Sequence, residues 1–130
     1  MKKSAYSFTI LIEASPFDYL ISQSAYNFTK AALVQHKVDS IFFNQQGIYH
    51  CLSACHADTT SNLFPDWIKL AKNNSVDLCI SIEDVRSRGL EKLFQSNQFK
   101  IKEIFRMASI GQLFEAMLMC DRFIQFKGIK

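Results

Sequence analysis

Apolar residues in this chain gather in short runs that polar or turn-forming residues separate. Runs rich in β-branched and aromatic residues predict strands at 6–12, 38–43 and 76–82, and shorter runs predict strands at 104–107 and 122–126. Between these runs, apolar residues recur at helical spacing. This spacing predicts helices from about residue 22 to 35, from about 65 to 73 and from 110 to about 120.

Candidate capping residues and apolar positions define these helices further. Ser22 or Ser24 is a suitable N-cap for the first helix, and Ser109 for the last. Pro65 fits the first turn of the middle helix, where its missing N–H costs nothing. In the last helix we expect an inward-facing apolar set followed by a buried cysteine; these residues are Leu113, Phe114, Met117, Leu118 and Cys120.

The alternation of strand and helix predicts an α/β fold. Helical crossovers between strands imply a mainly parallel sheet with helices on both faces. We therefore expect residues 1–130 to form one domain, a three-layer α/β/α sandwich. In such sheets, sites form where strands end at their carboxyl edge. In this chain those ends fall at 13–19, 44–55, 79–88 and 108–111.

Composition excludes some classes of protein and leaves others open. The chain has 130 residues, of which 48% are hydrophobic and 21% charged, as expected for a globular protein. A net charge of +3 is too weak to indicate a nucleic-acid binder by itself. No apolar segment approaches the roughly 18 residues of a transmembrane helix. The opening residues alternate like a strand rather than a signal peptide, so we expect a cytoplasmic protein with reduced thiols.

Cys79 is the main candidate for chemistry. It lies near the carboxyl end of a predicted parallel strand, followed by a helix or turn whose amides would stabilise a thiolate. Arg86 and Arg88 come soon after and would also lower its pKa, whereas Glu83 and Asp84 are nearer and would raise it. Since a cysteine within a strand often serves only as a small hydrophobic residue, the residues alone leave both roles open.

Other candidate chemistries have weaker support. His50, Cys51, Cys55 and His56 lie within seven residues but lack the paired spacing of a structural zinc site, so we expect no metal. The four glycines are not grouped into a phosphate-binding loop, and we expect no cofactor. Cys51 and Cys55 receive no role.

Three segments together point to a known family. They are FFNQQGIYH at 42–50, VDLCISIEDVRSRG at 76–89 and ASIGQLFEAMLMCDRFIQF at 108–126. Their order and spacing, together with the opening strand, resemble the DsrE family nearly from end to end. This resemblance implies a flavodoxin-like α/β/α fold and a sulfurtransferase that carries sulfur as a persulfide on the cysteine matching Cys79.

The resemblance also implies a pathway and partners. It implies assembly with TusB-like and TusC-like subunits into a hetero-hexamer, a TusA-like sulfur donor and a TusE-like acceptor. The sulfur would reach the 2-thiouridine of the tRNA wobble position, without direct tRNA binding or membrane contact. Arg86, Arg88 and Tyr49 become candidates for lining a pocket or stabilising the thiolate.

The chain departs from the family pattern after its cysteine. Glu83 and Asp84 replace small or apolar residues, and Arg86 and Arg88 are separated by a serine. Three alternatives therefore stay open beside the tRNA sulfur relay. They are a non-catalytic subunit of such a complex, a DsrE-type subunit of sulfur oxidation and, more remotely, a flavin-binding protein. A fully buried, inert thiol would favour the non-catalytic subunit.

Overall fold

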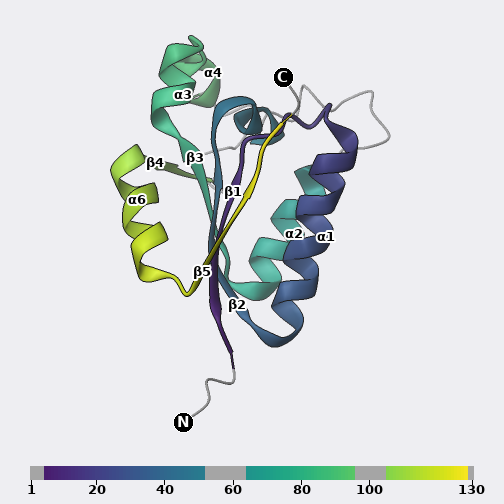
Figure 1. The fold of residues 1–130 in the computed structure, drawn as a ribbon. Helices are drawn as coiled ribbons and strands as arrows, with labels where there is room; N and C mark the ends of the chain where they lie inside the picture. The colour runs from purple at the N-terminus through teal and green to yellow at the C-terminus, as the bar shows by residue number, and fades with distance from the viewer. Residues whose placement is uncertain (1–4, 52–63, 96–104, 129–130) are drawn as a thin grey trace.

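The chain forms a five-stranded parallel sheet with helices on both sides (Figure 1). A computed structural model describes residues 5–51, 64–95 and 105–128. The strands are β1 (Ser7–Ile12), β2 (Lys37–Phe43), β3 (Asp77–Ser81), β4 (Arg106–Ala108) and β5 (Arg122–Phe126). They lie in the order β4-β3-β2-β1-β5, so β4 and β5 form the two edges of the sheet. The predicted α/β fold with a parallel sheet is confirmed.

Helices form the outer layers of the sandwich. Helices α1 (Tyr19–Gln35) and α2 (Phe64–Asn74) lie on one side of the sheet, and α6 (Ile110–Met119) lies on the other (Figure 1). The 3-10 helix η1 (Gln45–Cys51) and the short helix α3 (Ile82–Ser87) follow strand ends at the carboxyl edge of the sheet, and α4 (Glu91–Gln95) comes after α3. The functional candidates therefore lie near this edge.

The two faces of the sheet carry separate cores, because successive strand residues point to opposite faces. The larger core lies under α1 and α2 and includes Phe43, Trp67 and Ile80. The smaller core lies under α6 and includes Phe42, Cys79 and Leu113. Cys79 therefore belongs to the thinner side of the sandwich.

Helix α6 packs on the sheet with a narrower face than the sequence predicted. Leu113 is buried and Met117 half-buried, as expected. Phe114 and Leu118 were expected to face inward, but they are 55% and 85% exposed. Phe114 and Leu118 are exposed because α6 is apolar on several sides and the sheet contacts only one of them.

Helix α1 begins earlier than its serines predicted. Its N-cap is Asp18, whose side chain makes no capping hydrogen bond, and the helix starts at Tyr19. Ser22 instead lies inside the helix, where its hydroxyl donates to the backbone oxygen of Ser15 at 2.8 Å. Ser109, by contrast, caps α6 as predicted, in a complete capping box with Gln112.

Other expectations need smaller adjustments. Strand β3 ends at Ser81, since Ile82 already begins α3, and β4 covers Arg106–Ala108 rather than 104–107. Cys120 is half-buried instead of buried. Residues 55, 56 and 104 lie outside the described part of the chain. Within the described ranges, no helix is both long and apolar enough to cross a membrane.

A test of the packing at the carboxyl edge is to replace Gly47 by alanine. The added Cβ would overlap the backbone oxygen of Ile12, so Gly47→Ala should lower the free energy of unfolding by about 1–3 kcal/mol. Urea denaturation measures this change. Gly111→Ala is the matched control, because its Cβ would meet nothing nearer than 3.7 Å and alanine favours a helix. Equal stability of the two variants would contradict the packing described.

Candidate functional site

Cys79 lies two residues before the end of β3, below the carboxyl edge rather than on it. Its side chain points toward α6 and is fully buried, at 0% exposure. Phe42 of β2 and Arg106 of β4 are its neighbours across the sheet. The residue that ends β3 on this same face is Ser81, whose hydroxyl accepts a hydrogen bond from the Asp84 amide and caps α3.

A small polar cluster surrounds the sulfur of Cys79. Asp77, Cys79 and Ser81 share one face of β3 because they alternate along the strand. Arg106 lies directly opposite Cys79, and its Nη2 is 3.2 Å from the sulfur. The same guanidinium donates to Asp77 Oδ2 from Nε at 3.0 Å and from Nη2 at 2.7 Å. Asp77, Cys79 and Arg106 thus form one contact network.

Burial controls the acidity of this thiol. It raises the pKa of Cys79 to about 12, and the negative charge of Asp77 adds to the rise. The positive charge of Arg106 acts in the opposite direction but is too small to reverse it. A cysteine with such a pKa is almost entirely protonated at neutral pH, so it is a poor nucleophile in this arrangement.

A groove leads from solvent toward this cluster. It has a volume of about 350 Å³ and runs beside α6, with Phe42 and Ser40 of β2 and Arg106 of β4 in its lining. The Arg106 side chain is 46% exposed, and it also contacts the Cys79 sulfur. Arg106 is therefore the part of this network that a molecule in the groove would meet.

The structure does not bring Arg86 or Arg88 to Cys79. Arg86 forms an ion pair with Glu91 at 3.7 Å, and both side chains are more than half exposed. Arg88 donates to the Tyr49 hydroxyl at 3.3 Å and stacks over its ring. Arg88 and Tyr49 are therefore brought together as a pair, while Arg106 is the cation that the thiol contacts.

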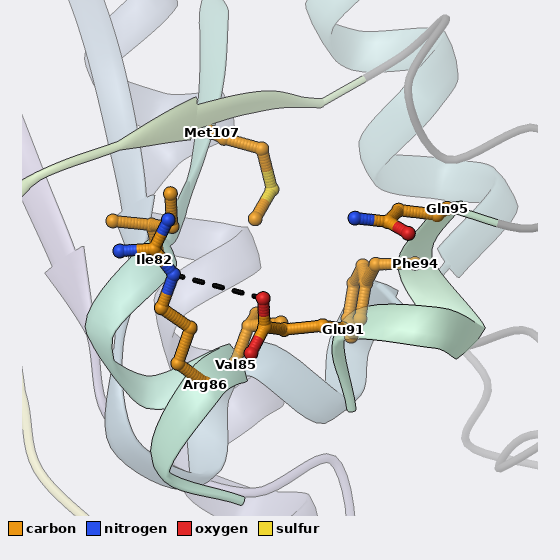
Figure 2. A pocket seen from close by; sticks show the side chains of 7 residues that line it. All are labelled: Ile82, Val85, Arg86, Glu91, Phe94, Gln95 and Met107. Atoms are coloured by element: carbon orange, nitrogen blue, oxygen red, sulfur yellow. Dashed lines mark ion pairs between the residues drawn. The ribbon is translucent and has the colours of Figure 1, made fainter. Parts of the chain in front are cut away.

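Arg86 does line a pocket of about 190 Å³ (Figure 2). Figure 2 shows Arg86 and Glu91 side by side, with Met107 of β4 across from them. Buried Val85 and Phe94 complete the apolar part of the lining. No cysteine lines this pocket among the described residues, so it offers no thiol chemistry of its own.

The remaining described cysteines have different surroundings. Cys51 is buried in η1, and its burial raises its pKa well above the usual value. Cys120 is half-buried and donates weakly to the Met117 backbone oxygen at 3.5 Å. His50 is also buried, with Nε2 3.0 Å from the Ala14 backbone oxygen. Across residues 5–51, 64–95 and 105–128, no group of three or more metal-ligating side chains exists.

Burial predicts an order of thiol reactivity. In the folded protein at pH 8, iodoacetamide should modify Cys120 at least about ten-fold faster than Cys79 or Cys51, because a buried, protonated thiol reacts only on opening. Peptide mass spectrometry at timed intervals measures the three rates. In urea the rates should converge, and a Cys79 rate equal to that of Cys120 in the folded protein would contradict this site geometry.

The raised pKa also predicts a pH-dependent stability. An unfolded cysteine loses its proton near pH 8.5, whereas folded Cys79 keeps it to about pH 12. Above about pH 9 the unfolded chain binds fewer protons, so stability should fall, by up to about 1.4 kcal/mol per pH unit from this thiol. Urea titrations of wild type and Cys79→Ala between pH 8 and 11 should show a steeper fall for wild type. If the stability of the two proteins fell equally with pH, Cys79 would not have a raised pKa.

Several known proteins similar in sequence to this chain are named as sulfurtransferases. Sulfurtransferase TusD of Photorhabdus laumondii is 28% identical over 95% of this chain and 99% of its own length. The sulfurtransferase TusD homolog of Vibrio vulnificus is 29% identical over the same shares. Sulfurtransferase TusD of Sodalis glossinidius is 32% identical over 81% of this chain and 86% of its own.

These relatives support sulfur transfer at a general level, and their names agree with the resemblance found in the motifs. The similarity is not confined to one motif, because the sequence signature of the DsrE/DsrF-like family matches residues 6–126. This span includes all five strands and the cluster around Cys79. The chain therefore belongs to the DsrE/DsrF-like family.

Proposed function

We propose that this protein is a sulfur-relay subunit that accepts sulfur as a persulfide on Cys79. The observation that carries the proposal is the 3.2 Å contact between Arg106 Nη2 and the Cys79 sulfur. Cys79 is the described cysteine with a guanidinium at its sulfur, and a cation stabilises both a thiolate and a persulfide anion. We expect a TusA-like donor and a TusE-like acceptor, in the cytoplasm, with 2-thiouridine of tRNA as the destination.

The transfer step needs no external oxidant. The Cys79 thiolate attacks the outer sulfur of the donor persulfide, so a new S–S bond forms on Cys79 while the donor S–S bond breaks. The donor leaves as a thiolate and takes up the proton that Cys79 released. The number of S–S bonds is unchanged. In the next step a thiolate of the acceptor attacks the outer sulfur of the Cys79 persulfide, and Cys79 leaves as a thiolate.

Burial sets a condition on this step. The donor must reach a sulfur that is fully buried and whose pKa is about 12. Arg106 contacts the Cys79 sulfur and also lines the groove beside α6, so it stands between the thiol and a molecule in that groove. We therefore expect the relay to require a partner that shifts Arg106, rather than the isolated chain in this arrangement.

A second function is a non-catalytic subunit of the same kind of assembly. The full burial of Cys79 favours this role. Sites in parallel sheets usually form at the carboxyl ends of strands, and at the end of β3 that position is held by Ser81, whose hydroxyl caps α3, and not by a thiol. In that role the chain would support sulfur transfer by binding partner subunits, and Cys79 would serve as packing.

The carrier role requires an S–S bond between Cys79 and the transferred sulfur, and the non-catalytic role does not. The wild-type protein, Cys79→Ser and the control Cys120→Ser should be incubated with a cysteine desulfurase, cysteine and a TusA-like donor. TusB-like and TusC-like subunits should be added in parallel samples. The carrier role predicts one added sulfur on the Cys79 peptide of wild type and Cys120→Ser, and none in Cys79→Ser, by mass spectrometry.

The opposite result is equally clear. If donor and partners are competent and no sulfur appears on Cys79, the carrier role is wrong and the non-catalytic role is the better account. Loss of 2-thiouridine in a deletion strain, restored by Cys79→Ser, would lead to the same conclusion within the cell.

A further inference from the structure

An apolar stripe runs along the outside of α6. Ile110, Phe114 and Leu118 are spaced by four residues, so they share one side of the helix. They are 46%, 55% and 85% exposed. Large apolar side chains aligned in this way on a protein surface typically mark a contact with another molecule.

Helix α6 also leaves its side of the sheet incompletely covered. Two helices cover the opposite face, whereas α6 has only ten residues (Figure 1). A groove of about 520 Å³ runs along one flank of α6, where Leu113, Phe114 and Met117 meet Leu11 and Phe123 of the sheet. The groove of about 350 Å³ that leads toward Arg106 runs along the other flank.

The stripe and the two grooves form one surface, which we call the α6 face. The α6 residues that line the larger groove, Ile110, Leu113, Phe114 and Met117, lie on one flank of the helix, and those that line the smaller groove, Gln112, Glu115, Ala116 and Met119, lie on the other. The helix therefore stands as a ridge between two channels. An element packed beside it would complete the outer layer as α1 and α2 do on the other face.

The charge of the larger groove narrows the choice of partner. Glu13, Glu83 and Asp84 are the charged side chains that line it, here called its acidic rim, and no lysine or arginine lines it among the described residues. Their hydrogen bonds come from neutral groups: Gln125 for Glu13, the Ile110 amide for Glu83 and the Gln45 amide for Asp84. The rim therefore keeps its negative charge although the whole chain is positive.

We propose that the α6 face binds a different protein chain, through an apolar segment of that chain flanked by lysine or arginine side chains. A second copy is disfavoured because it would bring acidic rim against acidic rim. Nucleic acid is disfavoured because its phosphates would meet the same carboxylates. An apolar segment with basic flanks would fill the larger groove and neutralise its carboxylates together.

The inference rests on the proposed function only for the choice of partner to test. Purified TusB-like and TusC-like subunits from the same organism are the probes, and their binding is measured by calorimetry without any sulfur donor. A failure of sulfur transfer would therefore leave this result intact. Sedimentation of the chain alone reports whether it pairs with itself.

Matched leucines make the experiment selective. Leu118→Glu on α6 and Leu20→Glu on α1 introduce the same charge at side chains that are 85% and 77% exposed, on opposite sides of the sheet. Leu118→Glu should weaken binding of at least one subunit by at least about ten-fold, as loss of an anchoring side chain does. Leu20→Glu should change the binding affinity by no more than about two-fold, because Leu20 is an exposed residue outside the proposed interface.

The acidic rim gives a second readout. Binding should weaken as salt concentration rises, because opposite charges are screened. Glu13→Gln removes one rim charge while keeping an oxygen for Gln125, so it should reduce that salt dependence.

Several outcomes would overturn the proposal. They are binding of neither subunit, binding that Leu118→Glu leaves intact, equal losses in both leucine variants, or affinity that does not respond to salt. A homodimer that Leu118→Glu dissociates would assign the α6 face to a second copy instead.

Discussion

The burial of Cys79 beside Asp77 and Arg106 determines what the thiol can do. Asp77 and Arg106 form an ion pair at 2.7 Å with both side chains nearly half exposed, so the pair adds little to stability. Its electrostatic effect on Cys79 matters more, because Asp77 raises the pKa of the thiol and Arg106 lowers it. While Asp77 holds Arg106, the two charges largely oppose each other, and desolvation keeps the thiol protonated.

The contact network of these three residues lies on the side of the sheet that only α6 covers among the described helices, next to the edge strand β4. Arg106 belongs to an edge strand and lines the smaller groove beside α6, so it faces both the thiol and the α6 face. A partner seated along α6 would approach Arg106 from the solvent side. Under the proposed function, partner binding would change access to Cys79 through this one side chain. Such a change would let a thiol that is buried in this arrangement take part in sulfur transfer, the activity that the names of the relatives give.

Much of the fold could be predicted from the sequence because buried parallel strands require continuous apolar runs. The runs that end at Ile12 and Phe43 predicted strands with nearly correct bounds. The start of α1 could not be predicted, because Asp18 makes no side-chain cap and Ser22 bonds to Ser15 instead. The exposure of Leu118 was equally hidden, since an apolar helix has the same pattern whether its own sheet or another chain covers it.

The candidate site was only partly predictable. Cys79 could be found from its place in β3, and Asp77 two residues earlier could have been noticed from strand alternation. Arg106 could not, because its place opposite Cys79 depends on the register between β3 and β4, which are far apart in the sequence. Arg86 and Arg88 were closer in sequence, but the helical turn of α3 carries them toward Glu91 and Tyr49.

Burial, with Asp77 and against Arg106, raises the pKa of Cys79 and holds it as a neutral thiol. The most direct test is an NMR titration of protein labelled with ¹³C at the cysteine Cβ, in wild type, Asp77→Asn and Arg106→Gln. We expect no Cys79 titration below about pH 10 in wild type, a lower pKa in Asp77→Asn and a higher one in Arg106→Gln. A wild-type pKa at or below the ordinary value of about 8.5 would contradict the account.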